Sequence, residues 1–272
     1  MVFRKILHDR TSNAVVRQIE SLILEGILRP GDQLPSEREL SKTVDVSRPI
    51  LREALKELEQ RGLLVSRHGE GTFVADVIGS VFSQPVIDLI SEHPKALLDY
   101  LEFRRDIEGT AAYYAASRAT EADKTILTHI HEQMLEAHDK RDPWIEATLD
   151  VEFHNAVSEC AHNIILMHTL RAYYRLLADG VFYNRTRLYA HDGSRNDLLK
   201  QHTAIYQAIM DGAADRARLA AENHMTYVMD AMRDADRMAS WQTVSDLRLE
   251  MARQSFLSTP QPAQRRRKPA AE

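Results

Sequence analysis

Four side chains in the second half of the chain have types and spacing that suit a bound metal ion. Asp150 and His154 are four residues apart, so on a helix their side chains project from one face. His202 and His224 lie on later segments with helical periodicity. Three imidazoles and one carboxylate suit zinc, nickel, manganese or another divalent transition metal, and they leave coordination positions for water or a small ligand.

The spacing of these residues leaves alternatives open. The chain has 12 histidines, and most histidines in proteins are surface residues or satisfied core residues. The histidines that could form rival sets are His129, His131, His138, His162, His168 and His191. Vacant positions on a metal would also permit hydrolysis or oxygen chemistry, so a metalloenzyme acting on a small carboxylate is the alternative function. Against it, there is no His-Glu-x-x-His motif, Asp150 would be consumed as a ligand, and Glu108 and Glu152 have no assigned role.

A second set of residues could contact nucleic acid. Arg48, Arg52 and Lys56 recur every four residues in a segment predicted to be helical from about 48 to 61, and they form a basic stripe. Arginine can bond O6 and N7 of guanine together, and basic side chains neutralise phosphates. The alternative is a solvated helix face in which Glu53 and Glu57 balance these charges.

The segments around the stripe favour the nucleic-acid interpretation. Ser36 and Glu39 have the spacing of a capping box ahead of a short helix that ends near Thr43. Ser47 offers the N-cap of the next helix, and Pro49 lies in its first turn, where a missing N–H costs nothing. The residues spaced to face the core are Leu51, Leu55 and Leu58. Two short helices joined by a tight turn predict a helix-turn-helix.

A hairpin follows these helices. Residues 63–65 and 72–74 have strand character and flank the turn sequence Gly69-Glu70-Gly71. His68 and Gly69 at its tip would lie near backbone phosphates or a minor groove. Three helices and a β-hairpin wing predict a winged helix-turn-helix that binds DNA, over residues 1–76.

The rest of the chain predicts an all-α architecture. Helical periodicity dominates after residue 95, and an all-helical bundle over 96–240 is the economical solution. The predicted helices cover residues 96–119, 121–140, 143–160, 163–187, 195–211 and 213–239. Residues 77–95, with Gly79, Pro85 and Pro94, are the predicted linker, and 241–272 are predicted to be a disordered basic tail. The expected fold class is therefore mainly α.

Net charge is a poor guide to the partner of this chain. The formal charge of -5 over 272 residues, taken alone, argues against a nucleic-acid binder. Residues 1–76 hold 12 basic and 12 acidic side chains, whereas 77–240 hold 17 basic and 25 acidic ones. The excess acid thus lies in the predicted bundle, and a neutral N-terminal segment can still present a positive helix face.

Composition excludes several classes of protein. The single cysteine, Cys160, excludes an internal disulfide and a Cys-rich zinc site, and fits a reducing compartment. No apolar run approaches the roughly 18 residues that a membrane span needs, and the N-terminus lacks the apolar stretch of a secretion signal. We therefore expect a cytoplasmic protein with no membrane partner.

The N-terminal motifs resemble the winged helix-turn-helix of the GntR regulator superfamily. They are Leu34-Pro35-Ser36-Glu37-Arg38-Glu39-Leu40, Val46-Ser47-Arg48, Leu51-Arg52-Glu53-Ala54-Leu55, Leu58, Gly62-Leu63 and Gly69-x-Gly71-Thr72-Phe73-Val74. The resemblance covers residues 10–75 and implies a homodimer on a palindromic operator in double-stranded DNA. The DNA-contacting positions that it implies are Arg38, Ser47, Arg48, Arg52, His68 and Gly69, and Lys56 of the basic stripe is a further expected phosphate contact.

The later motifs resemble the FadR-type branch of that superfamily, whose helical ligand-binding unit is the FCD domain. They are residues 101–109, Asp150-x-x-Phe153-His154, Ala161-His162-Asn163, His202-x-x-Ile205-x-x-Ala208-Ile209 and Ala221-x-x-His224-Met225. The resemblance covers residues 96–238. It implies that Asp150, His154, His202 and His224 hold a divalent metal, and that Arg104 meets the carboxylate of an organic-acid effector.

Within this branch, residues 102–116 are most similar to the pyruvate dehydrogenase complex repressor and its lactate- and glycolate-responsive relatives. The resemblance implies a DNA-binding transcriptional repressor rather than an enzyme. Its operator binding would be controlled by a small organic acid, such as pyruvate or lactate, bound near a metal that we expect to be zinc.

Overall fold

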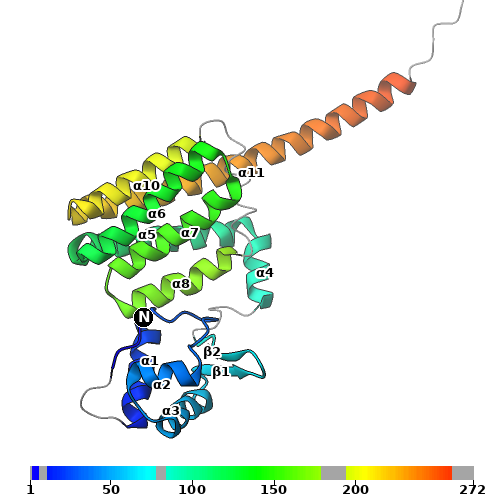
Figure 1. Cartoon of the computed structure of the whole chain (residues 1–272). Coiled ribbons are helices and arrows are strands. Elements are labelled where there is room, and N and C mark those ends of the chain that lie inside the picture. The colour runs from blue at the N-terminus through cyan, green and yellow to red at the C-terminus, as the bar shows by residue number, and fades with distance from the viewer. Residues whose placement is uncertain (1, 6–10, 78–83, 179–193, 259–272) are drawn as a thin grey trace, which may run out of the picture.

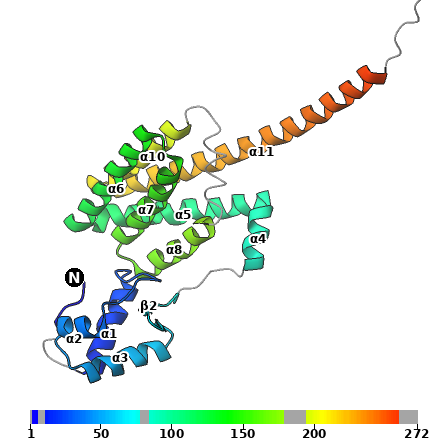
Figure 2. The same cartoon turned by 45° about the vertical axis from the view of Figure 1, so that its right-hand side comes forward.

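The computed structural model describes residues 2–5, 11–77, 84–178 and 194–258. Figure 1 shows a small N-terminal body below a larger helical bundle, from which one long helix projects. Figure 2 shows the same arrangement after a 45° turn, with α3 on the side of the N-terminal body remote from the bundle. Within the described ranges, no helix combines the length and the apolar character that a membrane span requires.

The N-terminal body is a winged helix-turn-helix, as predicted. Its elements are α1 (Ser12–Leu24), α2 (Glu37–Val44), α3 (Arg48–Gln60), β1 (Leu64–Arg67) and β2 (Gly71–Val74). The strands pair antiparallel, from Leu64 opposite Val74 to Arg67 opposite Gly71. The apolar side of α3 is buried against α1, and the core residues include Ile19, Leu40, Leu51, Leu55 and Leu58.

Local signals explain where these helices begin. The capping box of α2 is confirmed, because the Glu39 amide donates to Ser36 Oγ and the Ser36 amide donates to the Glu39 carboxylate, each at 3.3 Å. Ser47 occupies the N-cap position of α3, but its side chain makes no capping hydrogen bond. Asp45 ends α2 in the left-handed conformation, with φ of 59°.

Helix α1 ends at Leu24, and a turn containing Gly26 follows it. Gly26 takes a φ of +68°, a conformation that glycine adopts without steric cost. A β-carbon at Gly26 would also collide with the guanidinium of Arg171, which belongs to the bundle. The positive φ accounts for the glycine, and the turn after α1 lies against the Arg171 side chain of the bundle.

The bundle is all-α, which confirms the predicted fold class. Its described helices are α4 (Gln84–Glu92), α5 (Pro94–Arg118), α6 (Glu121–Lys140), α7 (Pro143–Cys160), α8 (Ile164–Ala178), α10 (Ser194–Met210) and α11 (Ala214–Ser258). Helix α5 packs most extensively against α11 and also contacts α7, α8 and α10. The buried small side chains of α5, which let its neighbours approach closely, are Ala111, Ala112, Ala115 and Ala116.

Two predictions about segment boundaries need correction. Residues 241–258 were expected to belong to a disordered tail, but α11 continues unbroken to Ser258. The physical reason is that residues 214–258 contain neither glycine nor proline, and the first helix-breaking residue is Pro260. The basic cluster at 265–268 lies outside the described residues. The predicted linker 77–95 contains the helix α4, and α5 begins within it at Pro94.

Candidate metal centre and nucleic-acid interface

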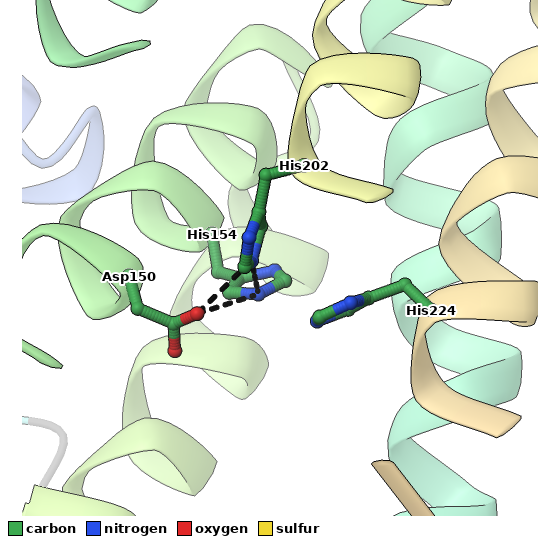
Figure 3. A group of neighbouring side chains, drawn as sticks. All are labelled: Asp150, His154, His202 and His224. Carbon is green, nitrogen blue, oxygen red and sulfur yellow. Dashed lines mark hydrogen bonds and ion pairs between the residues drawn. The ribbon is translucent and has the colours of Figure 1, made fainter. Parts of the chain in front are cut away.

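Helices α7, α10 and α11 bring Asp150, His154, His202 and His224 together (Figure 3). One candidate ligand atom from each residue lies within 4.8 Å of the others. Asp150 Oδ1 lies 3.0 Å from Nε2 of His202 and 3.9 Å from Nε2 of His154. The two Nε2 atoms of His154 and His202 are 3.3 Å apart. The three histidines are buried and Asp150 is partly buried.

Helix α7 supplies two of these residues because its start is well defined. The side chain of Asp142 accepts hydrogen bonds from the amides of Trp144 and Ile145, at 3.0 and 3.2 Å, and Pro143 occupies the first turn. From that start, residues 150 and 154 project from one face toward α10 and α11. The fully buried Phe153 packs edge-on against His202, with ring centroids 5.2 Å apart.

The chemistry of the donor set fits a divalent metal. Burial, together with the imidazoles of His202 and His154, holds the pKa of His224 well below its ordinary value. His224 is therefore neutral at physiological pH, which is the form that coordinates metals. A ligand set of imidazole nitrogens and one carboxylate is typical of zinc and of other divalent transition metals. A cation placed between the four side chains would accept lone pairs that otherwise face one another.

Two neighbouring side chains orient the candidate ligands. Nδ1 of His154 lies 2.8 Å from Oε2 of Glu108, and Nδ1 of His224 lies 2.9 Å from Oε1 of Gln201. A second partner of this kind fixes the tautomer and the orientation of a metal-binding histidine. The sequence alone assigns no role to Glu108 or to Gln201. The signal for Glu108 was its position four residues after Arg104 on one helix.

Arg104 lies beside the histidine cluster but does not face solvent. Its Nε and Nη2 atoms are each 2.6 Å from Oε1 of Glu108, and both side chains are buried. Its guanidinium carbon lies 5.9 Å and 5.3 Å from the ring centroids of Tyr100 and Tyr174. Burial opposes the charge on both partners, but the Arg104 charge and the contact with His154 lower the pKa of Glu108 to about 2. Burial likewise opposes the charge of Arg104, and Glu108 raises its pKa.

Most of the rival histidines have other partners. His131 lies 2.9 Å from Thr203 Oγ1 and stacks on Tyr206. The remaining partners are Gln133 for His129, Asn196 for His138, Asp123 for His162 and the carbonyl of Leu24 for His168. His191 lies outside the described residues. The described part of the chain thus holds one histidine-rich cluster of metal-binding geometry.

All residues predicted to contact DNA are exposed on the N-terminal body. Arg48, Arg52 and Lys56 lie along the exposed face of α3. The others are Arg38 on α2, Ser47 before α3, and His68 and Gly69 at the turn between β1 and β2. Nε of Arg52 pairs with Glu37 Oε2 at 2.8 Å, and both side chains are exposed, so a phosphate or base could replace that carboxylate.

Comparison with known proteins shows what kind of molecule carries these features. Residues 11–74 match the family of bacterial regulatory proteins called gntR, and residues 99–227 match the FCD domain. A candidate regulator of the L-lactate dehydrogenase operon of Escherichia coli K12 is 37% identical over 235 residues, which cover 85% of this chain and 90% of that protein. The chain belongs to the GntR family.

Two further similar proteins support the assignment of the chain to the GntR family. The Glc operon transcriptional activator of Escherichia coli K12 is 35% identical over 225 residues, covering 82% of this chain and 89% of that protein. A solved GntR structure from Streptococcus agalactiae is 26% identical and covers 81% of this chain and 99% of its own, with a TM-score of 0.52. The chain is therefore a transcriptional regulator of the GntR type with an FCD domain, and it is not an enzyme.

Proposed function

We propose that this GntR regulator is a repressor whose operator binding is controlled by a small organic acid and a divalent metal. The observation that carries the proposal is the buried cluster of three histidines and Asp150, with Arg104 one side chain away. A positive arginine next to a metal cluster suits a small anion. A core that served only for stability would more economically be apolar.

Zinc is the metal that we propose for this centre. Asp150, His154, His202 and His224 would hold it, and when bound it would supply a positive centre for the oxygens of an acid. Arg104 would provide charge-assisted hydrogen bonds to the carboxylate of the same acid. Tyr100 and Tyr174 cover the guanidinium and limit its access to water.

A 2-hydroxy acid such as lactate or glycolate is the effector class that we favour, and the 2-oxo acid pyruvate is the next candidate. Two observations support a small acid. The relative from Escherichia coli is named for the L-lactate dehydrogenase operon. The cluster is enclosed by α5, α7, α10 and α11, and an enclosed site of this kind admits a small molecule more readily than a long acyl chain.

The proposed DNA complex contains a homodimer on a palindromic operator. Arg48 and Arg52 of each α3 would enter the major groove, where arginine distinguishes guanine. Arg38, Lys56 and the hairpin turn would contact phosphates and set the register. The remote position of α3 from the bundle leaves this face accessible (Figures 1 and 2).

Helices α7 and α8 could transmit the state of the centre to the DNA-binding domain. Helix α7 carries Asp150 and His154, and near its end Glu159 pairs with Arg29 at 2.8 Å. Helix α8 places Tyr174 against Arg104, and its His168 Nε2 lies 2.8 Å from the carbonyl oxygen of Leu24. We propose that effector binding favours a placement of the two domains that weakens DNA binding, because the effector binds that placement more tightly.

A thermal-shift screen tests the sensor part of the proposal. Lactate, pyruvate, glycolate, citrate and a fatty acyl-CoA would each be added to the purified protein with and without zinc. We expect one of the small acids to raise the melting temperature only when zinc is present, because a ligand that binds the native state stabilises it. No stabilisation by zinc, or equal stabilisation by acids in the His202→Ala/His224→Ala variant, would contradict the proposed centre.

A further inference from the structure

Glu108 lies between the candidate metal ligand His154 and the predicted effector-binding Arg104. Its Oε1 is 2.6 Å from Nε and Nη2 of Arg104, and its Oε2 is 2.8 Å from Nδ1 of His154. The exposed fractions of the three side chains are 4% for Glu108, 8% for Arg104 and 6% for His154. Arg104 thus donates to Oε1, whereas Oε2, which has no hydrogen bond within the described residues, lies at ion-pair distance from His154 Nδ1. Burial leaves little room for water to replace either contact.

Only a carboxylate can serve both neighbours at once. Arginine and the Nδ1–H of a metal-binding histidine are both donors, and an ionised carboxylate accepts on both oxygens. A glutamine amide has one accepting oxygen, and its NH₂ group would face a second donor. The contact to Nδ1 also determines which nitrogen of His154 is available, because it leaves Nε2 directed toward Asp150 and His202.

We propose that Glu108 is a positioning residue that ties His154 to Arg104. It orients the metal-binding nitrogen of His154 through one oxygen and holds the guanidinium beside the metal centre through the other. The inference rests on the proposed function, since it takes the histidine cluster to be a metal site. It adds that the metal-binding part and the anion-binding part of the sensor share one carboxylate.

The affinity for zinc alone tests this role, with no effector needed. Glu108→Gln should weaken zinc binding by about 10- to 100-fold, the usual effect of losing the partner of a metal-binding histidine. Arg104→Met should strengthen zinc binding or leave it unchanged, because it removes a positive charge near the metal and leaves the Glu108 carboxylate beside His154. A role in packing alone would weaken zinc binding in both variants.

The measurement is competition for zinc with a chromophoric chelator, using the full-length protein. Glu102→Gln is the matched control, because Glu102 lies on the same helix with its side chain 60% exposed. If Glu108→Gln does not fold, Arg104→Met/Glu108→Gln replaces it, since the double variant leaves no buried charge unpaired. We expect this double variant to fold and to bind zinc about tenfold more weakly than the wild type.

Each outcome decides the proposal. Wild-type zinc affinity in Glu108→Gln, or in the double variant, would overturn the role of Glu108 and leave the metal centre standing. If Arg104→Met or Glu102→Gln lost as much zinc affinity as Glu108→Gln, the positioning role of Glu108 would also be overturned. Failure of the wild type to bind zinc would refute the metal centre itself, and the wild-type titration shows this before any variant is compared.

Discussion

Arg29 of the N-terminal domain and Glu159 of α7 form an ion pair that joins the two domains, with 2.8 Å between Nη2 and Oε1. Arg171 of α8 also pairs with Glu159 and approaches the carbonyl of Gly26 at 3.4 Å. Glu159 is therefore shared between both domains, and it lies on the helix that carries Asp150 and His154.

Replacing Glu159 by glutamine should weaken the coupling between the sensor and DNA. We expect the zinc- and lactate-dependent change in DNA affinity to shrink by about 0.5–2 kcal/mol, a typical effect of mutating a coupling contact. The measurement is the operator Kd with and without zinc and lactate, on a site selected in vitro with the wild-type protein. Glu152→Gln, on the exposed side of α7, is the control. An unchanged response in Glu159→Gln would show that this ion pair does not participate.

Substitutions on α3 should separate base recognition from phosphate contact. Arg48→Ala and Arg52→Ala should each cost about 1–3 kcal/mol on the selected site and relax its sequence preference. Lys56→Ala should weaken binding to all sequences and reduce the salt slope by about one. Fluorescence anisotropy at several salt concentrations measures both effects. Lys200→Ala is the control for net charge, because Lys200 lies far from α3 and its side chain is 77% exposed. Wild-type DNA affinity and sequence preference in both arginine variants would refute the placement of Arg48 and Arg52 in the major groove.

Two methionines of α11 test how far the bundle extends along this helix. Met232 is 1% exposed, whereas Met251 is 73% exposed on the projecting part. Met232→Ala should lower the free energy of unfolding by about 2–5 kcal/mol, because it leaves a cavity in the core. Met251→Ala should stay within about 0.5 kcal/mol of the wild type. Urea denaturation measures both, and a large loss in Met251→Ala would show that the projecting segment packs against something in solution.

The cap of α6 predicts a pH-dependent contribution to stability. Burial raises the pKa of Asp123, but hydrogen bonds from Thr120 and His162 outweigh it and lower the pKa below 3.8. A lowered pKa stabilises the fold above pH 3.8, and this stabilisation is lost as the pH falls through the folded-state value.

Asp123→Asn should therefore be less stable than the wild type by about 0.5–2 kcal/mol at pH 5. The difference should shrink below pH 3.8, where the carboxyl takes up a proton in the unfolded wild type while it stays ionised in the folded protein. Chemical denaturation between pH 3 and 6 measures it. Glu121→Gln, with that side chain 91% exposed on the same helix, should remain within about 0.5 kcal/mol at pH 5. A constant difference across this range would exclude a titrating contribution from Asp123.

The parts of the fold that could be predicted were those governed by local signals. Capping residues and apolar periodicity placed α2, α3, α6 and α7 to within a few residues. The end of α1 also has a local signal, because Gly26 adopts a positive φ just after the helix. The contact of this turn with Arg171, 145 residues away in the sequence, could not be predicted. The prolines and basic residues after 259 predict disorder. That prediction was wrong for residues 241–258, which contain no helix breaker and continue α11.

The same distinction applies to the site. Asp150 and His154 could be paired from helical spacing, but three-dimensional packing alone brings His202 and His224 to them. The family resemblance supplied that link. Glu108 offered a spacing signal relative to Arg104, whereas its contact with His154 joins two helices and has no signature in one sequence. Tyr174 faces Arg104 from α8 for the same reason.

We propose that a metal centre and a small acid together control DNA binding. The most direct measurement is the operator Kd of the wild type and of His202→Ala/His224→Ala, each with zinc alone and with zinc plus lactate, pyruvate or glycolate. We predict that one acid weakens DNA binding by the zinc-loaded wild type at least tenfold and leaves the variant unchanged. An equal response in both proteins, or no response to any acid, would contradict control of DNA binding by this metal centre.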